Sequence, residues 1–131
     1  MPDISPFIRY RDARTAISWL KEAFAFDPIF VVENDDGSIG HAQLRAGDGI
    51  IMVSTLKDDD LGMAVPGPDG RSTMGVYLVV DDADAHYERA RAAGAKIVMA
   101  PTDEDYGGRD YVCRDPEGHT WSFGTYRPGN E

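Results

Sequence analysis

The sequence predicts an α+β fold in which two tandem β-α-β-β-β modules form curved mixed sheets around a cleft. Three observations support this prediction. The chain has 131 residues, enough for one domain with a sizeable core. Its 42% hydrophobic and 27% charged residues are typical of a globular protein that folds without disulfide bonds or metal ions to stabilise it. The third observation is an internal repeat with a constant separation of 70 residues.

The repeat is clearest at the start of each module. The segment FIRYRDARTAISWL, which begins at Phe7, aligns with YLVVDDADAHYERA, which begins at Tyr77, so that Asp12 falls on Asp82. Each aspartate follows a short apolar strand pattern and precedes a helical pattern. A carboxylate at that position can accept hydrogen bonds from the first free amides of a helix. We therefore expect each module to begin with a strand, an aspartate cap and a helix.

Apolar residues recur at spacings of three and four in both expected helices, which indicates one buried stripe on each. These residues are Ala13, Ala16, Ile17, Leu20, Ala23 and Phe24 in the first helix and Ala83, Tyr87, Ala90 and Ala93 in the second. Gly94 follows the second stripe, where a left-handed residue can end a helix.

Three strand-like segments follow each helix. They cover residues 29–34, 40–46 and 49–55 in the first module and 96–100, 109–114 and 119–126 in the second. Asp36-Gly37 predicts a tight turn in the first module, and Asp115-Pro116-Glu117-Gly118 predicts one in the second. Residues 57–72 are rich in Asp, Gly and Pro and are expected to link a module at 1–56 to a module at 73–131.

Alternation in the last strand of each module predicts which face of each sheet is buried. Ile51 and Val53 align with Trp121 and Phe123, so these four residues should form the floor under the helices. The opposite face of each sheet is then free. We expect a binding site in the cleft that the two free faces share.

Charge and composition exclude several classes of partner and location. The 13 Lys and Arg and 23 Asp and Glu give a net charge of -10, which argues against nucleic acid and membrane surfaces as partners. The one cysteine, Cys113, forms no internal disulfide and is expected in the core. The first residues lack the pattern of a signal peptide, so a cytoplasmic location is expected.

Motifs in both modules add a resemblance to a known family. The duplicated β-α-β-β-β pattern resembles the vicinal oxygen chelate superfamily, also called the glyoxalase, bleomycin-resistance and dioxygenase superfamily, over nearly the whole chain. The closing hairpin is the most specific part, with YGGR from Tyr106 and RDPEGHTWSF from Arg114. GHAQL from Gly40 and IMVS from Ile51 resemble the PhnB-like branch. The resemblance, together with the limited core of each module, implies a homodimer.

The resemblance also implies where a metal would bind. Metal-dependent members carry His, Gln or Glu ligands in the first and last strand of each module, and these positions correspond to Ser5, Met52, Gly75 and Ser122. A thioether, a glycine and two hydroxyls are not ligands that a hard or borderline divalent ion prefers. We therefore expect no metal and no other cofactor at the ancestral site. What remains is a cleft of the kind that metal-free, drug-binding members use.

The expected function is the sequestration of a small aromatic or amphipathic ligand. We expect the ligand to contact the apolar or aromatic residues Phe7, Met52, Tyr77, Tyr106 and Tyr111, and to be oriented by the polar residues Arg9, His41 and Arg109. Tyr106 and Arg109 bracket two glycines, which make their loop pliant. His86 and His119 are expected on the surface or in turns.

Two other functional classes stay open at this stage. In an enzyme of the same superfamily, a lyase, isomerase or dioxygenase, His41 or Arg109 would assist a proton transfer, with or without a recruited metal. A protein-interaction module would have a collapsed cleft and no small ligand.

Overall fold

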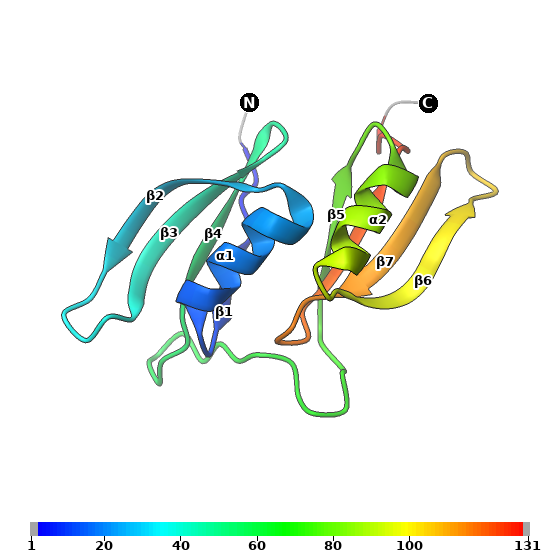
Figure 1. Cartoon of the computed structure of the whole chain (residues 1–131). Coiled ribbons are helices and arrows are strands. Elements are labelled where there is room, and N and C mark those ends of the chain that lie inside the picture. Colours follow the sequence, from blue (N-terminus) through cyan, green and yellow to red (C-terminus); the bar gives the residue numbers. More distant parts are fainter. Residues whose placement is uncertain (1–2, 130–131) are drawn as a thin grey trace.

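The computed structural model describes residues 3–129 and contains two modules of one design (Figure 1). The first module consists of β1 (Phe7–Tyr10), α1 (Ala13–Phe24), β2 (Asp27–Glu33), β3 (Ile39–Ala46) and β4 (Gly49–Thr55). The second consists of β5 (Gly75–Val79), α2 (Ala83–Ala92), β6 (Lys96–Asp103), β7 (Arg109–Arg114) and β8 (Thr120–Gly124). The predicted order of elements is therefore confirmed in both halves of the chain.

Each module folds its four strands into one mixed sheet. The strand orders are β1-β4-β3-β2 and β5-β8-β7-β6. The first strand of each module pairs in parallel with the last, and the remaining pairs are antiparallel. The two sheets stay separate and do not close into a barrel. Residues 56–74, which connect them, contain no helix or strand.

The two helices begin at the predicted aspartates. Asp12 accepts a hydrogen bond from the backbone amide of Thr15 at 3.1 Å, and Asp82 accepts one from the amide of Ala85 at 3.0 Å. Gly94 has φ of 96°, as expected of a glycine that follows a helix. Neither helix in the described residues 3–129 is long and apolar enough to cross a membrane.

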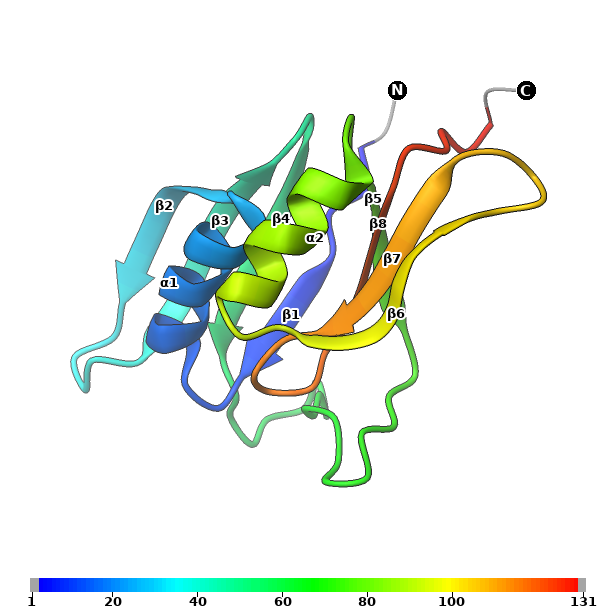
Figure 2. The same ribbon diagram turned by 45° about the vertical axis from the view of Figure 1, so that its right-hand side comes forward.

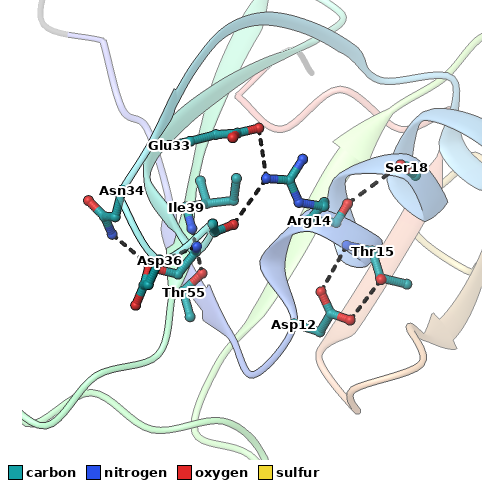
Figure 3. A network of polar contacts seen from close by, with 11 residues as sticks. Asp12, Arg14, Thr15, Ser18, Glu33, Asn34, Asp36, Ile39 and Thr55 are labelled. Atoms are coloured by element: carbon teal, nitrogen blue, oxygen red, sulfur yellow. Dashed lines mark hydrogen bonds and ion pairs between the residues drawn. The ribbon is translucent and has the colours of Figure 1, made fainter.

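Arg14 ties the exposed side of α1 to the β2–β3 hairpin (Figure 3). Its Nη2 lies 2.7 Å from Glu33 Oε1 and donates to the carbonyl of Gly37 at 3.0 Å. Gly37 has φ of 84° in the tight turn that the sequence predicts. Because Arg14 and Glu33 are both about half exposed, the ion pair adds little stability and mainly fixes the position of the hairpin.

The core lies between the helices and the sheet faces that they cover. Ile51, Val53, Trp121 and Phe123 are at most 2% exposed, which confirms the predicted facing. Figure 2 shows α1 and α2 side by side, and the two helices are in contact. The ring centroids of Phe24 in α1 and Phe123 in β8 are 4.6 Å apart. The two modules therefore share one continuous core.

Asp115 joins the two modules by polar contacts as well. Its Oδ2 accepts hydrogen bonds from the hydroxyl of Tyr10 at 2.6 Å and from the indole of Trp121 at 3.0 Å. Its Oδ1 accepts from the backbone amides of Glu117 and His119 at 3.0 and 3.1 Å. Since Tyr10 belongs to the first module, the carboxylate, only 4% exposed, links β1 to the turn before β8.

Four strands have other bounds than the sequence predicts: β2 and β3 are shifted by one or two residues at their ends, and β6 and β8 differ more in length. β6 runs to Asp103 because, beyond an irregularity, Thr102 and Asp103 pair with Asp110 and Arg109. β8 ends at Gly124 rather than at residue 126. Thr125 still donates its amide to the carbonyl of Arg109 at 3.1 Å, but the Arg109 amide donates to the hydroxyl of Thr125 at 2.9 Å and not to its carbonyl.

The structure corrects the position of His86 and places His119 beside the Gly118 turn, where it was expected. The ring of His86 lies 4.0 Å from that of Phe123 and 5.8 Å from that of Phe24, and burial lowers its pKa to about 4. The Nε2 of His119 donates to the carbonyl of Arg9 at 2.9 Å. Both rings lie where the second module packs against the first. The sequence of the second module alone does not reveal which of its residues the first module covers. Cys113 is fully buried, as predicted.

Candidate functional site

The larger hollow of the molecule is a groove between the two modules. It has a volume of about 1130 Å³ and is lined by residues 4–7 and 46–51 on one side and by β5 with its neighbours at 74–81 on the other. Apolar side chains that line it include Ile4, Phe7, Ile50, Met74 and Tyr77. Phe7 is 57% exposed and Met74 66% exposed, so much of this apolar surface faces solvent. We call this hollow the inter-module groove.

A smaller cavity of about 470 Å³ adjoins the groove beneath the linker. Phe7, Met74 and Val76 line both hollows, so the two lie next to each other. Linker residues 62–66 and 71–73 form one wall of the smaller cavity, and His119 and Thr120 form part of another. The linker therefore closes one end of the inter-module groove.

Matched rows of side chains cross the free faces of the two sheets. In the first sheet Phe7 pairs with Met52, and Met52 pairs with Gln43. In the second sheet Tyr77 pairs with Ser122, and Ser122 pairs with Val112. The 70-residue repeat thus places Phe7 and Tyr77 at equivalent positions on the two sides of the groove, while Met52 and Ser122 lie one strand further away.

The four ancestral metal positions offer a poor donor set. Ser5 and Gly75 line the groove, whereas Met52 and Ser122 lie in the rows just described. The hydroxyl of Ser122 donates to the carbonyl of Tyr111 at 3.3 Å. In residues 3–129, no three side chains of His, Cys, Asp or Glu gather as a metal-binding group. The donors at these positions therefore do not fit a divalent ion.

Arg9 lies beside Phe7 in β1, but the linker holds its guanidinium group. Nη1 and Nη2 donate to the carboxylate of Asp59 at 3.0 and 2.9 Å, and Nη1 also donates to the carbonyl of Lys57 at 3.3 Å. The hydrogen bonds between them raise the pKa of Arg9 and lower the pKa of Asp59. Only 6% of Arg9 is exposed. In this structure the guanidinium group fastens the linker over the sheet, and Arg9 also lines the smaller cavity.

His41 lies on β3, two strands away from β1. The amide nitrogen of Gln43 donates to its Nε2 at 3.0 Å, and its ring stands edge-on to Phe30 at 6.1 Å. His41 lines neither of the two hollows. The structure thus brings together Phe7 and Tyr77 of the expected site but leaves His41 apart from them.

Tyr77 and Tyr106 lie at the other end of the second sheet from the linker. The hydroxyl of Tyr77 donates to the carbonyl of Tyr126 at 2.8 Å. Tyr106 is 58% exposed, and its hydroxyl lies 3.0 Å from Asp110 Oδ2 and 3.2 Å from Glu104 Oε2. Desolvation, followed by the hydrogen bond to Asp110, raises the pKa of Tyr106 to about 12.

Asp110 is a functional candidate that the sequence reasoning missed. It is only 6% exposed although it lies on the face of β7 that α2 leaves free. Strand alternation was a signal that could have found it. Asp110 and Tyr111 are neighbours in a predicted strand and point to opposite faces, so a buried Tyr111 places Asp110 on the cleft face.

The structure corrects the expected positions of Arg109 and Tyr111. Both residues face α2, as Cys113 does, because positions 109, 111 and 113 alternate with the free-face positions of β7. Tyr111 is fully buried with its hydroxyl 2.5 Å from His86 Nδ1, and burial raises its pKa. Arg109 donates to Asp84 at 3.0 and 3.1 Å. Neither residue lines the groove or the smaller cavity.

The substitution Arg109→Ala is expected to leave ligand binding unchanged. Its carboxylate partners Asp84 and Asp103 are exposed, so we expect the free energy of unfolding to fall by less than about 1 kcal/mol. Urea denaturation measures the stability, and calorimetry with a groove ligand measures the affinity. A tenfold loss of affinity in this variant would return Arg109 to the site.

Comparisons with known proteins agree with this architecture. Residues 4–123 match the family model described as "Glyoxalase/Bleomycin resistance protein/Dioxygenase superfamily". Uncharacterized protein Mb0911c of Mycobacterium bovis is 36% identical over 128 residues, which cover 94% of this chain and 82% of that protein. Putative glyoxylase CFP32 of the same organism is 40% identical over 82 residues, which cover 61% of this chain and 31% of that protein.

Solved structures show the same fold. TioX from Micromonospora sp. ML1 has a TM-score of 0.79 and 32% identity, with 97% of this chain and 100% of that chain covered. A glyoxalase/bleomycin resistance protein from Streptomyces sp. CB03234 has a TM-score of 0.69 and 18% identity, with 93% and 98% covered. The second likeness concerns the fold alone.

Proposed function

We propose that this chain, which belongs to the Glyoxalase/Bleomycin resistance protein/Dioxygenase superfamily, binds and sequesters a small aromatic or amphipathic molecule. The inter-module groove is the observation that carries the proposal. Its volume of about 1130 Å³ is large enough for a ligand of drug size. Apolar side chains in the groove, Phe7 and Met74 above all, are exposed. A ligand that removes them from water therefore lowers the free energy of the complex.

We propose further that binding uses no divalent ion at Ser5, Met52, Gly75 and Ser122. Protein purified without chelator is expected to contain only substoichiometric Zn, Ni, Mn or Fe by elemental analysis, because these positions supply no carboxylate, imidazole or thiolate. One equivalent of any of these metals, located among the four residues by anomalous scattering, would overturn the proposal.

The binding proposal is tested with a variant of the groove. A thermal-shift screen of aromatic and amphipathic compounds should find ligands, since a ligand at 100 times its dissociation constant stabilises by about 2.7 kcal/mol. Phe7→Ser should weaken each of them by about tenfold or more, because the side chain loses its contact with the ligand.

Leu61→Ser is the matched control for this variant. Leu61 is 63% exposed but lines neither hollow, so its replacement should leave the affinities unchanged. Ligands that bind wild type and Phe7→Ser equally well would place the site outside the groove. A screen in which no compound stabilises the protein contradicts the proposal as a whole.

An enzyme of the same superfamily, a lyase, isomerase or dioxygenase, is the alternative outcome of this screen. An enzyme would convert one of the compounds that it binds, and the product would be detected after incubation with the protein. The positions of His41, outside the groove, and of Arg109, against α2, do not favour it.

The homodimer, the cytoplasmic location and the PhnB-like branch remain predictions. Four consecutive residues of the edge strand β2, at 29–32, are apolar and between 42% and 51% exposed, and this supports a second copy as partner.

A further inference from the structure

Asp110 is a buried carboxylate that has one oxygen without a partner. It lies on the free face of β7 and pairs with Gly124 of β8. Its Oδ2 accepts a hydrogen bond from the hydroxyl of Tyr106 at 3.0 Å. Its Oδ1 is shielded from solvent and accepts no hydrogen bond from any residue between 3 and 129. Burial of a carboxylate oxygen without a donor costs free energy, so this arrangement is not explained by stability.

Two tyrosines, Tyr77 and Tyr106, lie next to this carboxylate, and a third, Tyr126, packs against Tyr106. Desolvation and the charge of Asp110 raise the pKa of Tyr77, which shows how near the two groups are. Tyr106 covers the other carboxylate oxygen, and its ring stands edge-on to that of Tyr126 with centroids 5.1 Å apart. A carboxylate among electron-rich rings is an environment that favours organic ammonium ions, through an ion pair and cation–π attraction together.

Gly124 allows Asp110 and Tyr77 to approach each other. A Cβ at this position would lie 2.6 Å from Asp110 Cβ and 2.6 Å from the hydroxyl oxygen of Tyr77, closer than Cβ atoms come in proteins. Both side chains therefore close over the glycine. Glycine inside a strand typically marks such a close approach, and any larger residue would push the two groups apart.

Tyr77 also connects Asp110 to the inter-module groove. Tyr77 is one of the residues that line the groove, and its hydroxyl end lies against Gly124 of β8. Asp110 itself lines neither the groove nor the smaller cavity, so the terminal group of a ligand whose body lies in the groove has to pass Tyr77 and Tyr106 to reach it. Tyr106 is the side chain that has to turn aside. It is more than half exposed and precedes Gly107 and Gly108, which have φ of 102° and 84°.

We propose that Asp110 binds the protonated amine of the groove's ligand, which makes this ligand an organic cation with an apolar body. This inference rests on the proposed function, because the body of the ligand occupies the groove. The ammonium group donates to Oδ1, which has no donor now, and to Oδ2 in place of the Tyr106 hydroxyl. The net charge of -10 attracts such cations to the protein.

Arg114 provides the competing assignment, a carboxylate ligand. It lies on the same face of β7, four residues from Asp110, and its Nε is buried with no hydrogen-bond partner among the residues that the structure describes. The linker covers it, since a Cβ at Gly70 would lie 3.3 Å from its Nη1. Asp110 is favoured because Tyr77, which lies near it, lines the groove, and because the Tyr106 hydroxyl that covers its Oδ2 belongs to a half-exposed side chain.

Three probes that share one naphthyl body separate these assignments. They are 2-naphthylethylamine, 2-naphthylethanol and 2-naphthylacetate, each titrated by calorimetry near neutral pH. In wild type the amine should bind about tenfold more tightly than the alcohol. Asp110→Asn should remove this preference and leave the affinity for the alcohol unchanged. Phe7→Ser should weaken the amine and the alcohol alike.

A ligand-free measurement separates binding from a structural role of Asp110. Because the asparagine removes an unpaired buried charge, Asp110→Asn should unfold at the same or a higher urea concentration than wild type. A clear drop in the midpoint would show that Asp110 holds the fold together and would count against the proposal.

Each result of the titrations has a distinct meaning. Equal affinities for amine and alcohol, unaffected by Asp110→Asn, overturn the Asp110 assignment but leave the groove standing if Phe7→Ser weakens both. Preference for the acetate that is lost in Arg114→Gln reassigns the polar end to Arg114. If no probe binds, both this inference and the binding function fail for this class of ligand.

Discussion

Replacing Asp115 with alanine is expected to lower the free energy of unfolding by about 3 to 5 kcal/mol, close to the limit for one side chain. The carboxylate accepts four hydrogen bonds, from the hydroxyl of Tyr10, the indole of Trp121 and the amides of Glu117 and His119. Tyr10 and Trp121 are at most 1% exposed, so water cannot replace the lost acceptor. Each buried donor left without a partner adds about 1 to 3 kcal/mol.

Two further variants serve as comparisons for Asp115→Ala. Asp69→Ala removes a carboxylate whose side chain is 62% exposed, and it should change the stability by less than about 0.5 kcal/mol. Tyr10→Phe removes one donor but leaves Asp115 with three, and it should cost about 1 kcal/mol. Urea denaturation followed by tryptophan fluorescence measures all three. If Asp115→Ala is no worse than Tyr10→Phe, the carboxylate does not hold the modules together as the structure indicates.

The fold could be predicted because its signals are local. The 70-residue repeat, the aspartate caps and the alternation in β4 and β8 depend only on neighbours in the chain, and all three appear in the structure at the expected places. The lengths of β6 and β8 depend on where pairing with β7 stops. That is decided by contacts between strands, so periodicity alone could not supply it.

Less of the candidate site could be predicted, for two different reasons. The partner of Arg9 is Asp59 in the linker, and no pattern in either segment reveals that contact. The facing of Arg109 and Tyr111, in contrast, was available from the sequence, because both share parity with Cys113, which was expected in the core. The same parity places Asp110 on the free face, where it now carries the inference about the ligand's charge.

His86 escaped the sequence analysis for a third reason. Its position in the first turn of α2 is typical of an exposed residue, but in the structure α1 of the other module packs against it. The ring stacks on Phe123, with Phe24 close by, and burial lowers its pKa from about 6.5 to about 4. A group that titrates so differently in the folded and unfolded chain makes the stability depend on pH.

Acid is therefore expected to destabilise the protein between about pH 6.5 and pH 4, before its carboxylates titrate. In this range the unfolded chain binds a proton at His86 that the folded chain does not, so the free energy of unfolding falls as the pH falls. The contribution is complete above pH 6.5, is lost progressively down to about pH 4 and does not change further below it. With the partial exposure of the ring taken into account, the loss amounts to about 2 to 3 kcal/mol.

The variant His86→Phe isolates this effect, because phenylalanine keeps the aromatic packing and cannot bind a proton. Urea denaturation across the same pH range should give a nearly flat stability for His86→Phe, while wild type and the control His41→Phe, altered on the free face, lose stability in parallel. Asp12, Asp36 and Asp59 have lowered pKa values, so their contribution is lost only as the pH falls below about 4. Their acid transition therefore lies below that of His86. A wild type whose stability is constant from neutral pH down to about pH 4.5 would show that His86 is hydrated in solution and that the modules pack less tightly there than the structure indicates.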